Sequence, residues 1–137
     1  MPNGTEDLWP ADVQTPTVVP PVAILRRQAA ILADRTKGLL EGQVDALTEG
    51  EQFRLLFYIV APSLGYRYKL FEVWHGVEGY PVYATDDGRR PLLPTFGRGP
   101  APLKLNTPDE LIAWLRQTLN SEETKRVVGS LLSQVTA

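Results

Sequence analysis

The chain has 137 residues, of which 43% are hydrophobic and 22% charged, and its formal net charge is −2. These values are typical of one soluble globular domain, and they exclude collagen-like, coiled-coil and wholly disordered chains. Cysteine is absent, which excludes disulfides, thiolate metal sites and cysteine nucleophiles.

Residues 1–20 are rich in proline and acidic, with Glu6, Asp7 and Asp12 and no basic residue. We therefore expect an extended or mobile tail, followed by a single domain over residues 21–137. Trp9 and the pair Val18-Val19 are the exceptions, because these apolar side chains could dock on the domain. The segment does not resemble a secretory signal and no long apolar run follows, so we expect a cytoplasmic protein without a membrane span.

Pro20-Pro21 begins a helical pattern that runs to about residue 38. Leu25, Leu32 and Leu39 share one direction at 100° per residue, and about half of the circumference is apolar. Such a width is typical of a helix that lies on a sheet.

The most apolar segment is 53–61, with the sequence FRLLFYIVA. It predicts a central strand with both faces covered. The cover is expected from the first helix on one face and the last two helices on the other, or from a second copy of the chain in a homodimer.

Residues 66–75 predict the next strand, and simple alternation divides its side chains between two faces. One face would carry Tyr66, Tyr68, Leu70, Glu72 and Trp74, and the other Arg67, Lys69, Phe71, Val73 and His75. Residues 80–85 predict a further strand, at an edge or beginning at Pro81.

Residues 89–105 form a long basic loop that contains no acid, with a short strand expected around 103–105. Thr107 to Glu110 then match a capping box, and Ser121 predicts a second cap, so two helices end the chain. Gly129 in the last helix suits a close approach between helices. The order predicts an α+β fold: an N-terminal helix, an antiparallel meander of three to five strands, and two C-terminal helices packed on the sheet.

No catalytic motif is present, and His75 is the only histidine. A catalytic triad and a multi-histidine metal site are therefore excluded, and we expect no metal and no cofactor. His75 is the one weak catalytic candidate, although a histidine beside a turn is more commonly a half-exposed polar residue.

A ligand pocket is expected between the sheet and the basic loop, over residues 89–104. Aromatic and basic side chains can stack on a ligand and neutralise it. The candidate residues are Arg67, Tyr68, Trp74, His75, Arg89 and Arg90.

Several segments resemble those of small uncharacterised bacterial proteins, some of which are carried on mobile, integron-type gene cassettes. These segments are FYIVAP at 57–62, YRYKLF at 66–71, YPV at 80–82 and SEETKRVV at 121–128. The resemblance covers about residues 22–134 and supplies no catalytic residues. It implies a bacterial, cytoplasmic protein with an accessory role.

Two functions follow from these observations. The first is a non-catalytic binding protein, which regulates or neutralises a macromolecular partner. The alternative is a protein that binds a small anionic or aromatic ligand, or a small enzyme, using the pocket beside the basic loop. Nucleic-acid binding is not expected at this net charge.

Overall fold

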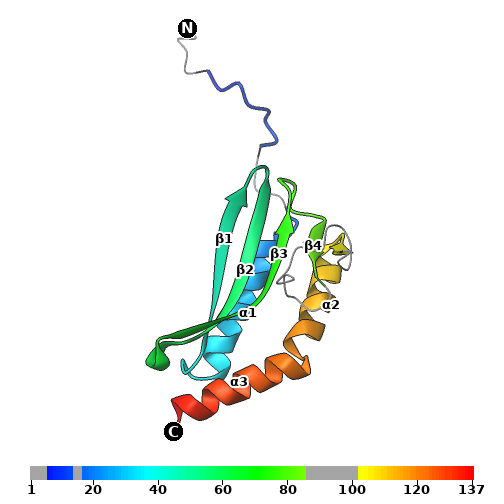
Figure 1. Cartoon of the computed structure of the whole chain (residues 1–137). Helices are drawn as coiled ribbons and strands as arrows, with labels where there is room; N and C mark the ends of the chain where they lie inside the picture. The colour runs from blue at the N-terminus through cyan, green and yellow to red at the C-terminus, as the bar shows by residue number, and fades with distance from the viewer. Residues whose placement is uncertain (1–5, 14–16, 86–101) are drawn as a thin grey trace.

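The computed structural model describes residues 6–13, 17–85 and 102–137, and its elements follow the predicted order (Figure 1). The elements are α1 (Pro21–Arg35), β1 (Glu41–Glu49), β2 (Gln52–Ala61), a 3₁₀ helix η1 (Pro62–Leu64), β3 (Tyr66–His75), β4 (Val82–Ala84), β5 (Leu103–Leu105), α2 (Pro108–Leu119) and α3 (Glu122–Val135). The α+β prediction, with one N-terminal and two C-terminal helices, is confirmed. Within the described parts of the chain, none of the helices has the length and apolar character needed to cross a membrane.

The five strands form one antiparallel sheet in the order β1-β2-β3-β4-β5, so each strand pairs with its neighbour in sequence. β2 lies between β1 and β3, as expected for its apolar sequence. β4 begins at Val82, directly after Pro81, and pairs with both β3 and β5. Of the two alternatives for this strand, the start beside Pro81 is therefore confirmed, and the edge position is wrong.

All three helices contribute to a single hydrophobic core on one face of the sheet. This core joins Leu25 of α1, Leu111 of α2 and Leu131 of α3 to Leu55 and Phe57 of β2. In Figure 1, α1 runs behind the sheet. The prediction that the first and last helices cover opposite faces is therefore wrong. Both faces of β2 are apolar, so the sequence pattern does not show which face the helices cover.

At the centre of this core lies Phe71, which has no exposed surface. Its ring stacks on Phe57 at 5.1 Å between centroids and meets the edge of Trp114 at 5.1 Å. Aromatic pairs of both geometries are favourable beyond the area that they bury. Phe71 thus joins the two central strands to α2.

A β-bulge interrupts β3 and changes which side chains face the helices. Phe57 is opposite Phe71, but the next residue, Tyr58, is opposite Lys69, so Leu70 is the additional residue. An extra residue on one strand shifts the alternation by one position. The alternation predicted for 66–75 is therefore wrong from Phe71 onward.

With the bulge included, the face toward the helices carries Tyr66, Tyr68, Leu70, Phe71, Val73 and His75. We call the opposite face the uncovered face, because no helix among the described residues packs on it. It carries Arg54, Leu56, Tyr58 and Val60 of β2, Arg67, Lys69, Glu72 and Trp74 of β3, and Asp45 and Tyr83 of the flanking strands.

α1 approaches β1 most closely at Gly42. A Cβ atom added there would lie 2.4 Å from the Cα of Ala29, which is closer than real Cβ contacts. Gly129, by contrast, has nothing within 4 Å of an added Cβ. The close approach expected at Gly129 is therefore wrong, and the glycine that permits close packing is Gly42.

Candidate functional site

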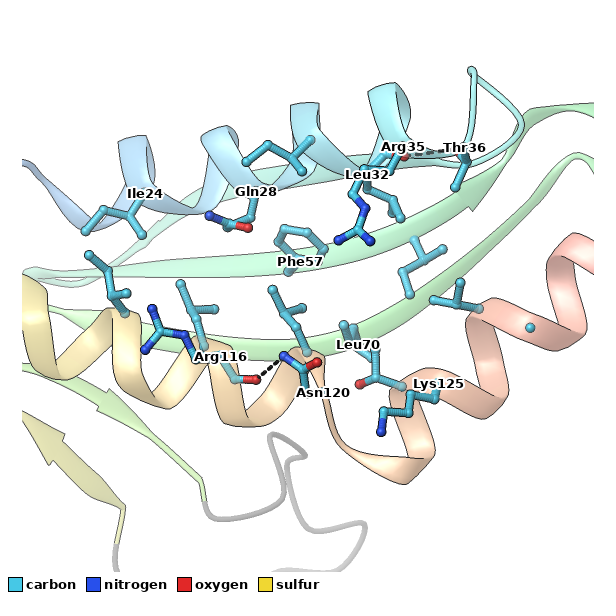
Figure 2. A pocket seen from close by; sticks show the side chains of 18 residues that line it. Ile24, Gln28, Leu32, Arg35, Thr36, Phe57, Leu70, Arg116, Asn120 and Lys125 are labelled. Atoms are coloured by element: carbon cyan, nitrogen blue, oxygen red, sulfur yellow. Dashed lines mark hydrogen bonds between the residues drawn. The ribbon is translucent and has the colours of Figure 1, made fainter.

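A groove of about 730 Å³ runs between α1 on one side and α2 and α3 on the other. Its floor is the helix-facing surface of the sheet, where the buried side chains of Phe57, Ile59 and Leu70 line the groove (Figure 2). Leu70 reaches the floor because the bulge turns it toward the helices. The groove thus depends on a local irregularity that strict alternation does not reveal.

The corner between α2 and α3 sets the shape of one wall. The Ser121 side chain caps α3 by accepting a hydrogen bond from Thr124 N at 3.2 Å. The Thr124 hydroxyl in turn donates to the Thr118 carbonyl at 2.8 Å, and the Asn120 amide donates to Arg116 O at 2.7 Å. These bonds satisfy backbone groups at the helix ends and hold α2 and α3 at a defined angle.

The opposite wall ends at Thr36, where α1 gives way to the connection to β1. The Thr36 hydroxyl lies 2.9 Å from the carbonyl oxygens of both Leu32 and Leu40. It also accepts a hydrogen bond from Leu40 N at 3.0 Å. One side chain therefore holds the connection at this end of the groove.

Three cationic side chains line the groove, one from each helix: Arg35, Arg116 and Lys125. Within the described part of the chain, no acidic residue lines the groove. Lys125 lies 3.7 Å from Glu122 on the surface, whereas Arg35 and Arg116 form no ion pair within the described part of the chain. In Figure 2, Arg35 projects from α1 toward the space above the floor.

This arrangement suits a ligand with an apolar body and more than one negative charge. Such a ligand would bury the partly exposed apolar side chains of the walls, Leu32, Ile112 and Val128. Burial of apolar surface is the main source of favourable free energy in such contacts. The guanidinium groups of Arg35 and Arg116 can each hold a carboxylate with two hydrogen bonds.

The candidate residues from the sequence are divided between the two faces of the sheet. Arg67 and Trp74 lie on the uncovered face, where each has an aromatic neighbour. The Arg67 guanidinium sits 4.0 Å from the centroid of the Tyr58 ring and 3.4 Å from the Asp45 carboxylate. Trp74 stacks on Tyr83, with 6.5 Å between centroids.

A buried carboxylate, Glu72, lies between the charged side chains of the uncovered face. Arg54 donates a hydrogen bond to it at 2.8 Å, and Lys69 donates one at 3.3 Å. Burial raises the pKa of Glu72, but the hydrogen bond from Arg54 and the positive charges of Lys69 and Arg54 outweigh burial and hold the pKa below its ordinary value. The same hydrogen bond raises the pKa of Arg54. Glu72 is thus an ionised structural partner.

Tyr68 and His75 lie on the helix-facing side. The Tyr68 hydroxyl donates to Glu123 at 3.1 Å and so joins β3 to α3. His75 is 9% exposed and stacks on Phe53 at 5.3 Å, with its Nδ1 2.7 Å from Gly76 O. No carboxylate of the described chain forms a hydrogen bond with His75, so its surroundings are those of a packed residue.

Arg89, Arg90 and most of the basic loop lie outside the described residues. The pocket predicted between that loop and the sheet therefore remains a prediction. In the ranges that are described, no three metal-ligating side chains gather at one place.

The groove cations were not among the residues predicted from the sequence to bind a ligand. Arg35 and Arg116 both border the apolar stripe of a helix, and neither has an acid four residues away along its helix. An acid at that spacing is the usual partner of a cation on a helix surface. The lack of such an acid was the one sequence feature indicating that Arg35 and Arg116 are available to a ligand.

Comparison of the chain with models of known families, with curated proteins and with solved structures found no match. The resemblance to proteins of mobile gene cassettes therefore remains a prediction. The inference of function rests on the chain's own residues.

Proposed function

We propose that this protein is a non-catalytic binding protein, and that its groove holds an acidic, apolar segment of a protein partner. The observation that carries the proposal is the set of three cations beside the apolar side chains of the groove walls, with no acid among the lining residues that the structure describes. Charge complementarity of this kind steers a partner toward a surface and rejects partners of the wrong sign.

The shape of the groove supports a peptide segment. The lining residues of α1 extend from Ile24 to Thr36, which corresponds to about 18 Å at the rise of an α-helix. An amphipathic helix of about three turns, or a short extended segment, spans that length. The cations come from both walls, so a segment lying along the floor meets positive charge on either side.

The lining residues also support a binding role without catalysis. Among residues 6–13, 17–85 and 102–137, neither a histidine nor a carboxylate lines the groove, and these are the groups that most often act as general acids and bases. Its polar side chains are suited to holding a ligand.

A small amphiphilic anion is the second candidate occupant. The volume of about 730 Å³ falls within the range of sites that bind small organic molecules. Both candidates use the same floor and cations, so the decisive difference is the length of the ligand.

The test begins with short peptides displayed on phage and selected on the full-length protein. We expect the selected sequences to combine Asp or Glu with large apolar residues. The dissociation constant of a selected peptide is then measured for the wild type and for the variant Arg35→Glu/Arg116→Glu. Affinity should fall by about tenfold or more, because two attractive charges become repulsive.

The matched control is Arg26→Glu/Arg27→Glu, which makes the same change of charge on exposed positions of α1 outside the groove. This variant should change affinity by less than about twofold, as expected for charges outside the contact. An equal loss in both variants, or selected sequences without acids, would contradict the proposal. Tight binding of decanoate together with no selected peptide would favour the small-anion alternative instead.

A further inference from the structure

We infer that residues 6–13 of the chain, here called the acidic arm, occupy the groove of the same molecule and compete with its partner. This inference rests on the proposed function of the groove. The arm has the two properties that the groove selects, apolar surface and negative charge, and it is attached close to one end of the groove.

The apolar side chains of the arm have no cover in the structure. Leu8 is 85% exposed, Trp9 is 76% exposed and Val13 is 63% exposed. Large apolar side chains gathered in one short exposed segment commonly mark a contact site, and tryptophan is the residue most enriched at the centres of binding surfaces. The arm therefore needs an apolar surface, and the partly exposed wall residues Leu32, Ile112 and Val128 of the groove supply one.

The charges of the arm and the groove are equal in number and opposite in sign. Glu6, Asp7 and Asp12 are the acids of the arm, which contains no basic residue. They match the three groove cations. With the apolar residues between the acids, the arm can place its apolar side chains on the floor while its carboxylates meet cations of both walls.

Two local hydrogen bonds form turns within the arm. Trp9 N donates to the Asp7 carboxylate at 3.0 Å, and Val13 N donates to the Pro10 carbonyl at 3.2 Å. Turns of this kind lower the entropy that a segment loses when it binds.

The attachment point allows the arm to reach the floor. The Tyr80 hydroxyl donates to Val19 O at 2.8 Å and so fixes the chain just before α1. Val13 lies six positions before Val19, and a chain of that length spans at most about 20 Å. Ile24, the first groove residue of α1, is only five residues beyond Val19.

Attachment within the same molecule also gives the arm an advantage over a free ligand. A short linker holds a segment at an effective concentration in the millimolar range. The arm can thus occupy the groove even if its intrinsic affinity is weak, and a partner must displace it.

The experiment uses a fluorescent peptide with the sequence of residues 5–14 as the probe. Its affinity is measured for the full-length wild type and for the full-length variant Leu8→Ser/Trp9→Ser. The arm variant should bind the probe about tenfold more tightly or better, because its own arm no longer competes. Both substituted side chains are exposed, so the fold should be unaffected.

Two further variants serve as controls. Val77→Ser changes an apolar side chain that is as exposed as Leu8 but lies in the turn after β3, and it should bind the probe as the wild type does. Gly129→Leu, added to the arm variant, should abolish probe binding, because it fills the groove from a position with open space around it.

The resting position of the arm is tested by ¹⁹F NMR of protein labelled with 5-fluorotryptophan. The Trp9 signal, assigned by Trp9→Phe, should shift when Gly129→Leu blocks the groove, and its position should not depend on protein concentration. A concentration-dependent shift would place the arm in a second copy and contradict the inference. Equal probe affinity for the wild type and the arm variant would also contradict the inference.

The inference and the proposed function fail in different ways. If peptides selected on phage bind through Arg35 and Arg116 but the arm probe does not bind, the arm inference is wrong and the function stands. If neither kind of peptide binds, both are wrong.

Discussion

The two faces of the sheet shelter apolar side chains in different ways. Phe57 and Leu56 are neighbours in β2 and point to opposite faces, and both are buried. Phe57 is covered by helices and by Phe71. Leu56 is 6% exposed on the uncovered face, where Glu72 lies opposite it and Arg54 lies two residues away on the same strand.

This comparison shows that long charged side chains can take part in sheltering a sheet. Arginine and lysine lay their apolar stems over neighbouring residues while their charges pair with one another or with water. On the uncovered face, Arg54 and Lys69 meet at Glu72. On the helix-facing side, the helices provide the cover, and the space between them is the groove.

The largest expected loss of stability comes from a substitution on the helix-facing side. Phe71→Ala should reduce the free energy of unfolding by about 3–5 kcal/mol, because it leaves a cavity between Phe57 and Trp114. Tyr83→Ala on the uncovered face removes a partly exposed ring and should cost about 1 kcal/mol. Urea denaturation of both variants measures the difference, and equal losses would refute the distinction between the two faces.

Gly42→Val should cost about 2–3 kcal/mol, because the new side chain meets the backbone of Ala29 and must displace α1. The control is Ala46→Val on the same strand, where the residue is exposed and a β-branched side chain is tolerated. Thermal unfolding compares the two. A Gly42→Val variant as stable as Ala46→Val would show that α1 does not pack directly on β1.

Arg54→Met should cost about 2 kcal/mol at neutral pH, because Glu72 keeps only part of its charge compensation. The folded-state pKa of Glu72 lies below its ordinary value of 4.5, so its ion pair stabilises the fold above that pH. This contribution is lost as the pH falls through the folded-state pKa. The difference in stability between wild type and variant should therefore shrink in acid, as urea titrations at several pH values would show. A difference that grows in acid would contradict the ion pair.

The smallest expected change is a gain in stability. Gly129→Ala should stabilise the protein by about 0.5–1 kcal/mol, because alanine favours the helix and the added Cβ meets no neighbour. The measurement is again urea denaturation. A loss of stability would mean that α3 packs closely at this position, and it would remove Gly129 from the groove.

The sequence predicted those features that depend on local chemistry. The Thr107 side chain accepts a hydrogen bond from Glu110 N at 3.2 Å, and the Glu110 carboxylate reaches back to Asn106 N at 2.8 Å, so the predicted start of α2 is confirmed. The cap at Ser121 is confirmed in the same way. Both depend on residues only a few positions apart.

Features that depend on distant segments were not predictable. The bulge at Leu70 arises from the pairing of β2 with β3, and the residue itself carries no signal of it. The side of the sheet on which the helices pack depends on how the chain connects the elements, since both faces of 53–61 are apolar. The groove results from both, which is why Arg35 and Arg116 were missed. The bulge is also why Trp74 shares a face with Arg67, and His75 with Tyr68, against the predicted alternation.

The central claim is that the groove is the binding site, and NMR mapping with ¹⁵N-labelled full-length protein tests it most directly. The labelled protein is titrated with a peptide selected on phage. The account predicts that the amide shifts cluster at groove residues such as Gln28, Arg116 and Gly129, while Trp74 and Tyr83 stay unchanged. Shifts centred on Trp74 and Tyr83, with the groove amides unmoved, would contradict it.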